Sequence, residues 1–254
     1  MAEQLRIFLQ AVMFFTRLPV PSQANWSPDY LNKASQYFSL VGWIVGGVAA
    51  GVFLLSQMLF PVEVAVALSM VASILLTGAF HEDGLADACD GFGGGWDRDQ
   101  ILTIMKDSRL GTYGACGLVL GLALKWLCLS RLNPTLIAPA LFVAHPFSRL
   151  ASTALIRFGS YARKDLESKA KPLAVEMNGF QFLVAAVFGL APFLMYPSPW
   201  IWASLAPVLL ITLYLKHYFE KWIGGYTGDC LGAVQQVTEL ITYLTLLGFS
   251  WKSI

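Results

Sequence analysis

Residues 78–117, GAFHEDGLADACDGFGGGWDRDQILTIMKDSRLGTYGACG, hold seven carboxylates in a chain that is 56% hydrophobic and only 13% charged. These are Glu82, Asp83, Asp87, Asp90, Asp97, Asp99 and Asp107. On a helix, at about 100° per residue, Asp83, Asp87 and Asp90 fall within roughly 60° of one another. Because three anions on one face repel unless a cation lies among them, the stretch predicts a metal site where a long apolar segment ends.

Long apolar segments on both sides of this stretch predict the fold class. The chain has 254 residues and a mean hydropathy of +0.60, and a helix needs about 20 apolar residues to cross ~30 Å of hydrocarbon. Windows of this kind lie near 38–60, 63–80, 112–130, 135–156, 180–196, 200–216 and 231–250. We therefore expect an all-α, polytopic membrane bundle of about seven transmembrane helices, forming one integral membrane domain over residues 1–254.

Two details of these windows matter for the topology. Pro197 and Pro199 separate the short windows 180–196 and 200–216, which indicates a tight helical hairpin. The window 231–250 is the least apolar, because it carries Gln235, Gln236 and Glu239.

The placement of the basic residues predicts the orientation. With a cytoplasmic N-terminus and seven spans, 13 of the 17 Lys and Arg residues fall on the cytoplasmic side. Only Arg131 and Lys252 lie outside, with Lys125 and Arg149 inside spans. By the positive-inside rule the N-terminus and all motif-bearing loops are cytoplasmic. A net charge of +1 carries no signal for nucleic acid.

The first 20 residues lack the features of a signal peptide. Arg6 and Gln10 interrupt the apolar run, and no small-residue cleavage site follows. An amphipathic helix on the inner membrane surface, ended by Pro19 and Pro21, fits the pattern better.

We expect the acidic stretch to continue the helix of window 63–80 through about Asp90, where the glycines of 91–95 break it. From Asp97 an amphipathic segment would lie against the membrane and lead to Asp107. Asp97 and Asp99 are expected to be solvated or to cap helices.

Hard cations such as Mg²⁺ prefer oxygen ligands, which favours Asp83, Asp87 and Asp90 as metal ligands. Asp107 would complete a two-helix cradle from a facing helix start. The alternative is a solvated acidic loop in which the Asp residues cap helices. His81 could be a ligand, a proton acceptor or an interfacial residue. Glu82 points about 100° away from the Asp face and is expected to be peripheral.

A second motif, GGYTGDCLG at 224–232, predicts an anion site. Glycines around Thr227, Gly228 and Asp229, at the start of a helix, make backbone N–H groups available to phosphate. Asp229 could equally cap that helix. Basic residues expected to bind phosphate are Arg109, with Ser108 beside it, the intramembrane Arg149, and Arg163.

Three motifs in register resemble one family. FHEDGLADACDG at 80–91, KDSRLGTYG at 106–114 and GGYTGDCLGA at 224–233 resemble the cobalamin synthase family of adenosylcobinamide-GDP ribazoletransferases. FFTRLPVP at 14–21 and SYAR at 160–163 are also similar, so the resemblance runs nearly end to end.

The resemblance implies an Mg²⁺-dependent transferase of phosphorus-containing groups in the bacterial inner (cytoplasmic) membrane. Such enzymes join adenosylcobinamide-GDP to α-ribazole, or to its 5′-phosphate, and release GMP. By carry-over, Asp83, Asp87 and Asp90 are metal-binding candidates, and Asp107, Arg109 and Asp229 complete the active site. Lipid surrounds the protein, and the sequence leaves open whether it is a homo-oligomer and whether one or two metal ions bind.

Two rival functions fit less well. CDP-alcohol phosphotransferases also cluster Asp residues at a membrane surface. Their pattern needs Ala-Arg after D-G-x-x, and this chain reads Leu85-Ala86-Asp87 after Asp83-Gly84. A cation transporter should place carboxylates near the midplane of its spans. We expect none there, because the carboxylates gather at the cytoplasmic ends.

Overall fold

The computed structural model describes residues 3–21, 32–162 and 176–251. Its regular structure there is helical, apart from a single β-bridge between Tyr161 and Tyr226. The α-helices are α1 (Glu3–Phe15), α3 (Phe38–Ser56), α4 (Val62–Thr77), α5 (Phe80–Gly94), α6 (Arg98–Ile104), α7 (Thr112–Arg131), α8 (Pro134–Phe158), α9 (Gly179–Leu190), α10 (Leu205–Ile223) and α11 (Gly228–Trp251). Short 3₁₀ helices are η2 (Ser35–Tyr37), η3 (Ala191–Met195) and η4 (Pro199–Ser204).

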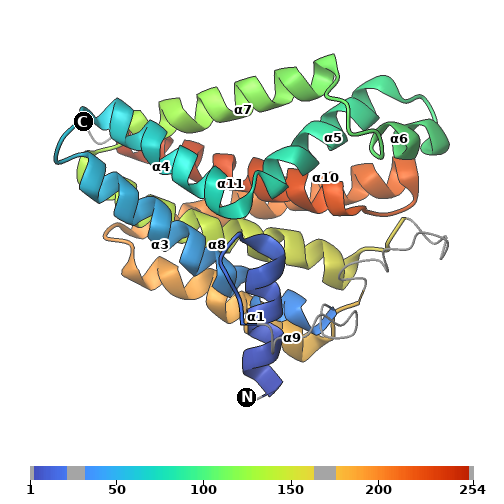
Figure 1. The fold of residues 1–254 in the computed structure, drawn as a ribbon, viewed down its shortest axis with the longest axis horizontal. Helices are drawn as coiled ribbons and strands as arrows, with labels where there is room; N and C mark the ends of the chain where they lie inside the picture. The colour runs from blue at the N-terminus through green and yellow to red at the C-terminus, as the bar shows by residue number, and fades with distance from the viewer. Residues whose placement is uncertain (1–2, 22–31, 163–175, 252–254) are drawn as a thin grey trace.

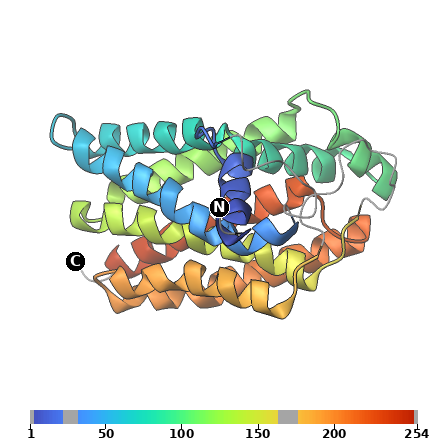
Figure 2. The same ribbon diagram turned by 60° about the horizontal axis from the view of Figure 1, so that its bottom comes forward.

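The central helices of the bundle are α8 and α11, which pack against each other (Figure 1). On one side α8 contacts α3 and α9, while α11 contacts α5 and α7. Figure 2 shows the long helices running side by side, with α1 crossing them. This order places α5 and α11, which carry two of the sequence motifs, in direct contact.

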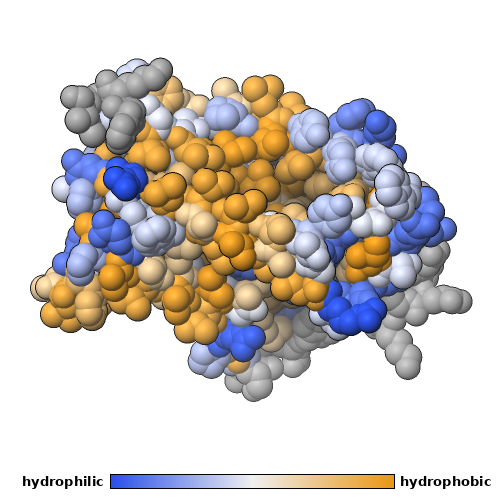
Figure 3. Space-filling view, turned by 90° about the horizontal axis from the view of Figure 1, so that it is seen from above, coloured by the Kyte–Doolittle hydropathy of each residue, from blue (hydrophilic) through white to orange (hydrophobic). Residues whose placement is uncertain are grey.

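The exposed surface has the apolar character expected of a membrane protein. Figure 3 shows an apolar band across the middle of one face, with hydrophilic residues gathered at both ends. Exposed apolar side chains include Leu68, Leu75, Val119, Leu120 and Leu209. Such a band would be covered by lipid.

Every expected window contains a helix, so the all-α polytopic class is confirmed, but the count of seven spans is not. By length and apolarity alone, four described helices could cross a membrane: Asn32–Ser56, Thr112–Arg131, Pro199–Ile223 and Gly228–Ser250. A fifth results if the bent pair α4–α5 counts as one span. Gly179–Met195 is shorter, and α8 carries several polar residues on its buried face.

The expected tight hairpin at Pro197 and Pro199 is wrong. Helix α9 packs mainly against α8, η2 and α3, whereas α10 packs mainly against α11 and α8. The 3₁₀ segments η3 and η4 separate the two helices and let them diverge.

The acidic stretch does not continue the helix of α4, which is a second correction. The chain bends by 87° between α4 and α5, at Gly78 (φ 65°) and Ala79 (φ 59°). Arg17 supports the bend, because its guanidinium lies against Gly78 and its backbone N–H donates to the Leu76 carbonyl at 2.8 Å. A cation at the C-terminal end of α4 also complements the helix dipole.

Helix α5 then runs to Gly94, beyond the expected break after Asp90. The glycines stay helical because neighbours pack closely on them. A Cβ on Gly91 would lie 2.6 Å from Met105 Cγ, and one on Gly93 would lie 2.5 Å from the Tyr113 ring. The helix therefore ends only where Gly95 becomes extended.

We expect Gly42→Ala to lower the free energy of unfolding by about 1–3 kcal/mol, because overpacking forces backbones apart. A Cβ on Gly42 would lie 2.5 Å from Pro146 Cα and 2.8 Å from the His145 carbonyl oxygen, atoms of α8 that cannot move aside. Gly47, on the same helix, has nothing within 4 Å. Gly47→Ala is the matched control in reversible unfolding in detergent, and equal effects of the two substitutions would contradict this packing.

Candidate active site at the crossing of α5 and α11

Two glycines bring the acidic motif and the GGYTGD motif together. A Cβ on Gly84 would lie 3.1 Å from the Asp229 carbonyl oxygen and 3.2 Å from Gly232 Cα. Helices α5 and α11 therefore cross with their backbones in contact, as small residues on both helices allow. Motifs that lie about 140 residues apart in sequence thus form one site.

Three carboxylates lie at this crossing. Asp229, in the first turn of α11, lies beside Gly84 of α5. Gly84 follows Asp83 directly in sequence and lies about one helical turn before Asp87. Asp83 is exposed, and Asp87 and Asp229 are half-buried. Asp83 and Asp87 share a face of α5 at i and i+4. These two carboxylates are accessible enough to meet a ligand from the surface.

Asp90, expected to be a metal ligand, caps α7. Its two carboxylate oxygens accept the backbone N–H groups of Gly111 at 2.7 Å and Gly114 at 2.8 Å. The carboxyl group is buried, and it lies at the positive end of the α7 dipole. Asp90 therefore fixes α7 against α5.

Removing this cap should be costly to stability. We expect Asp90→Ala to lower the free energy of unfolding by about 2 kcal/mol, because two charge-assisted hydrogen bonds are lost and two N–H groups lose their partner. Asp90→Asn keeps one good acceptor and should lose about half as much. Unfolding measured without Mg²⁺ tests the cap, since a residue that only bound metal would then leave stability unchanged.

Asp107 and Arg109, expected to bind metal and phosphate, are paired with each other. Arg109 Nη2 donates to Asp107 Oδ2 at 2.5 Å, and Arg109 Nε lies 3.0 Å from both carboxylate oxygens. Hydrogen bonds from Arg109 hold the pKa of Asp107 below its usual value, and the same pair raises the pKa of Arg109. Ser108, between them, is exposed.

The predicted four-carboxylate cradle does not form. Within residues 3–21, 32–162 and 176–251, no three His, Cys, Asp or Glu side chains come together as a metal site. Asp90 is turned toward α7 and Asp107 toward Arg109. Asp83 and Asp87 share an accessible face of α5, and Mg²⁺ is usually held by one or two carboxylates, with substrate phosphates and water supplying the rest. The donor set therefore fits a metal that arrives with its substrate.

His81 is buried within an aromatic group. Its ring stacks on Phe15, with centroids 5.5 Å apart and planes 7° from parallel, and meets Phe80 edge-on. This packing joins α1 to the start of α5 and favours the interfacial role among the three considered for His81.

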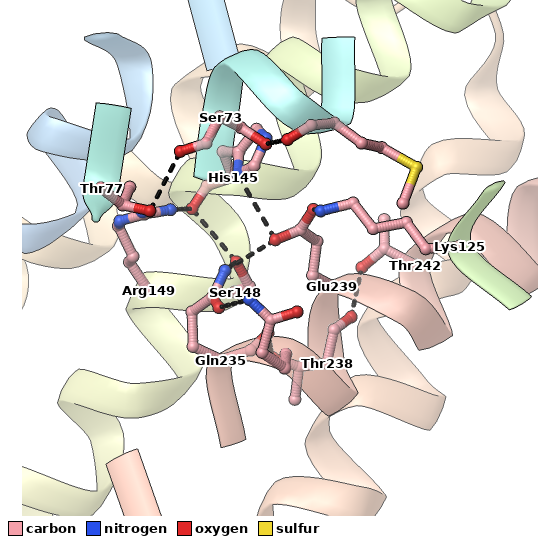
Figure 4. A network of polar contacts seen from close by, with 12 residues as sticks. Ser73, Thr77, Lys125, His145, Ser148, Arg149, Gln235, Thr238, Glu239 and Thr242 are labelled. Atoms are coloured by element: carbon pink, nitrogen blue, oxygen red, sulfur yellow. Dashed lines mark hydrogen bonds and ion pairs between the residues drawn. The ribbon is translucent and has the colours of Figure 1, made fainter. Parts of the chain in front are cut away.

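Arg149 lies in a buried polar network instead of at a phosphate site (Figure 4). Its Nη1 donates to the His145 carbonyl at 2.9 Å, one turn earlier on α8. Its charge lies within electrostatic range of Glu82 and Glu239. The guanidinium is thus held inside the bundle, between α8, α5 and α11.

Glu239 is the centre of that network. It forms an ion pair with Lys125 of α7 and accepts hydrogen bonds from Gln235 Nε2 at 2.7 Å and Tyr243 Oη at 3.0 Å. His145 Nδ1 lies 3.4 Å away. Glu239 is in the middle of α11, so the expectation that no span midpoint carries an acidic residue is wrong. The sequence does indicate this ion pair, because Lys125 and Glu239 are charged residues of opposite sign in two apolar windows.

The GGYTGD loop is held by backbone contacts. Gly224 (φ 75°) ends α10. The Tyr226 N–H then donates to the Ser160 backbone carbonyl at 2.8 Å, and the Ala162 N–H donates to the Tyr226 backbone carbonyl at 2.9 Å. Burial raises the pKa of the Tyr226 hydroxyl. The segment before Arg163 therefore lies beside this motif, although Arg163 itself is outside the described residues.

Thr227, not Asp229, caps α11. Thr227 Oγ1 accepts the Cys230 N–H at 3.3 Å and donates to Asp229 Oδ2 at 3.2 Å. Gly228 follows it and is exposed. The first backbone N–H groups of α11 thus lie next to Asp229, and N–H groups at a helix N-terminus can bind an anion.

Arg98 has a role that the sequence did not indicate. Its Nη2 donates to the Ala162 carbonyl at 2.9 Å and its Nε to the Ile223 carbonyl at 3.3 Å. It joins the start of α6 to the end of α10 and to the strand-like segment at Ala162. Asp97 and Asp99 behave as expected, since Asp97 caps α6 through the Gln100 N–H at 2.9 Å and Asp99 is exposed.

Comparison with known proteins identifies relatives over nearly the whole chain. A family model described as cobalamin-5-phosphate synthase matches residues 7–247. An adenosylcobinamide-GDP ribazoletransferase of Shewanella frigidimarina is 47% identical over 252 residues, covering 96% of this chain and 95% of the relative. A protein of the same name from Vibrio cholerae is 43% identical over 251 residues, covering 97% and 95%. No solved structure matches.

Proposed function

The chain belongs to the cobalamin-5-phosphate synthase family, and we propose on that premise that it is an adenosylcobinamide-GDP ribazoletransferase whose active site is the α5–α11 crossing. The site would join adenosylcobinamide-GDP to α-ribazole or α-ribazole 5′-phosphate and release GMP. The observation that carries the location is the contact of Gly84 with Asp229 and Gly232, which unites two motifs in one place.

The reaction is a displacement at phosphorus. A ribose hydroxyl oxygen of the ribazole attacks the phosphate on the cobinamide side of the diphosphate, and a new P–O bond forms. The bond from that phosphorus to the bridging oxygen breaks, and GMP leaves with the electron pair. The hydroxyl proton passes to a base, for which the accessible carboxylates at the crossing are the candidates, since His81 is enclosed by aromatic rings.

The residues of this chain would position the diphosphate. Asp83 and Asp87 would hold Mg²⁺, which when bound neutralises the charge that develops on the leaving phosphate. The exposed N-terminus of α11, at Gly228, would direct its N–H groups toward a phosphate oxygen. Arg109 could exchange its bond to Asp107 for one to phosphate, because both side chains are at the surface.

We place the site at the cytoplasmic face of the bacterial inner membrane. Arg98 begins α6, and Lys106 and Arg109 follow it, at one of the two hydrophilic ends of the bundle (Figures 1 and 3). Basic residues concentrate on the cytoplasmic side of membrane proteins. The bulky corrinoid would dock from the lipid-facing side while its nucleotide reaches the crossing.

The test is GMP release by the purified full-length protein in nanodiscs. Adenosylcobinamide-GDP, α-ribazole 5′-phosphate or α-ribazole, and Mg²⁺ are supplied together and then omitted one at a time. GMP that requires all three, with a corrinoid product of matching amount, supports the proposal. A folded, monodisperse protein that releases no GMP under any of these conditions refutes it.

A further inference from the structure

Glu82 occupies a buried position in the first turn of α5, although its place on the helix predicts a peripheral residue. It is 8% exposed. Its Oε1 accepts a hydrogen bond from Gln236 Nε2 of α11 at 3.0 Å, and its Oε2 is buried without a hydrogen-bond partner in the part of the chain that the structure describes. Burying a carboxylate costs free energy unless it is paired, so the hydrogen bond from Gln236 is important for holding Glu82 in this position.

The partner of Glu82 is itself fixed by a run of side-chain hydrogen bonds. Gln236 Nε2 also donates to Gln235 Oε1 at 2.9 Å, and Gln235 Nε2 donates to Glu239 Oε2 at 2.7 Å. Glu239 is paired with Lys125 of α7. We name the run of Glu82, Gln236, Gln235 and Glu239 the Glu82–Glu239 chain.

The amide N–H groups of the Glu82–Glu239 chain are all engaged in hydrogen bonds. A carboxamide nitrogen has two hydrogens. Both are used in Gln236, by Glu82 and Gln235, and both are used in Gln235, by Glu239 and by Ser148 Oγ at 3.0 Å. Because every amide hydrogen of the two glutamines is engaged, another arrangement of either side chain would break one of these hydrogen bonds. The position of the Glu82 carboxylate is therefore set from the interior of the bundle.

The geometry points to Glu82 as a positioning residue for the adjacent acidic face. Because Glu82 and Asp83 differ by about 100° around α5, holding Glu82 against α11 sets the rotation of the helix and hence the direction of Asp83 and Asp87. We propose that the Glu82–Glu239 chain fixes this rotation so that both carboxylates meet Mg²⁺ and the diphosphate. The proposal rests on the proposed function and deepens it.

A positioning role predicts a specific pattern of substitutions. Glu82→Gln keeps an oxygen that accepts the Gln236 N–H, so kcat and the KM for Mg²⁺ should stay within about 3-fold of wild type. Glu82→Leu and Gln236→Leu remove the bond, and a small misplacement of reacting groups can cost about 100-fold. We expect a kcat about 10–100-fold lower, with a higher KM for Mg²⁺. Glu63→Gln, at the exposed start of α4, is the acid-to-amide control.

A pair of variants tests the same bond even if Glu82→Leu fails to fold. Gln236→Glu places two carboxylates against each other and should lower kcat at least about 10-fold. Adding Glu82→Gln restores the hydrogen bond between α5 and α11 with donor and acceptor exchanged, and should recover part of that loss, since the donor to Gln235 Oε1 is still missing. A structural role alone predicts less folded protein without this recovery of kcat per folded molecule.

A second readout does not depend on turnover. Mg²⁺ supplied together with adenosylcobinamide-GDP should raise the thermal unfolding temperature of the wild type and of Glu82→Gln, and less so that of Gln236→Leu, because bound ligand stabilises the folded state. If the wild type releases no GMP, the proposed function falls, while the Mg²⁺ shifts still test the positioning. Glu82→Gln as inactive as Glu82→Leu, or Gln236→Leu indistinguishable from wild type in every readout, would overturn the inference.

Discussion

An Asp87→Ala variant should lose at least about 1,000-fold in the rate of GMP release, equivalent to ~4 kcal/mol of transition-state stabilisation. Asp87 is half-buried one turn from Gly84, where α5 meets Asp229. Asp90 caps α7 and Asp107 pairs with Arg109, so Asp83 and Asp87 are the α5 carboxylates that we propose to hold the cation. Losing one of two carboxylates leaves the diphosphate charge largely uncompensated.

The loss should be chemical, not structural. Alanine is the best helix former, and Asp87 is not deeply buried, so the variant should unfold at nearly the wild-type temperature in the absence of Mg²⁺. Asp99→Ala removes an exposed acid from α6, in the same acidic stretch, and should keep full activity. The measurement is single-turnover GMP release at saturating Mg²⁺, and more than a tenth of wild-type activity in Asp87→Ala would remove Asp87 from the metal site.

The helices were accessible from the sequence because apolar windows reflect burial in lipid or protein. Each window became a helix, and Pro19 and Pro21 follow the end of α1 as expected. The bend at Gly78 was missed because Ala79, a good helix former, also adopts a left-handed conformation there. Only tertiary contacts, such as Arg17 against Gly78, stabilise that conformation.

The roles of the acidic residues depend on packing that a helical projection cannot show. The spacing places Asp83, Asp87 and Asp90 on one face of α5, but two different helices, α7 and α11, pack near that face. Asp90 meets the start of α7, whereas Asp87 lies a turn from the α11 contact. Likewise Glu82 is peripheral to the Asp face and yet buried, because its side of α5 is the one that faces Gln236.

Glu239→Leu should be the most destabilising single substitution considered, lowering the free energy of unfolding by about 3–5 kcal/mol. It leaves Lys125 buried, with a side chain that is 6% exposed and without its carboxylate partner. It also removes the acceptor for Gln235 and Tyr243. The expected measurement is reversible unfolding in mixed micelles.

A compensating substitution separates the ion pair from the other bonds. Lys125→Met combined with Glu239→Leu replaces the pair by apolar side chains of similar volume, which often restores stability. The half-exposed i, i+4 pair Lys216–Glu220 is the control, because breaking it should cost only about 0.3–0.5 kcal/mol. If the double variant is as unstable as Glu239→Leu alone, the hydrogen bonds to Gln235 and Tyr243 carry the stability instead. The same double variant should then also lose GMP release, since Gln235 anchors Gln236 and through it Glu82.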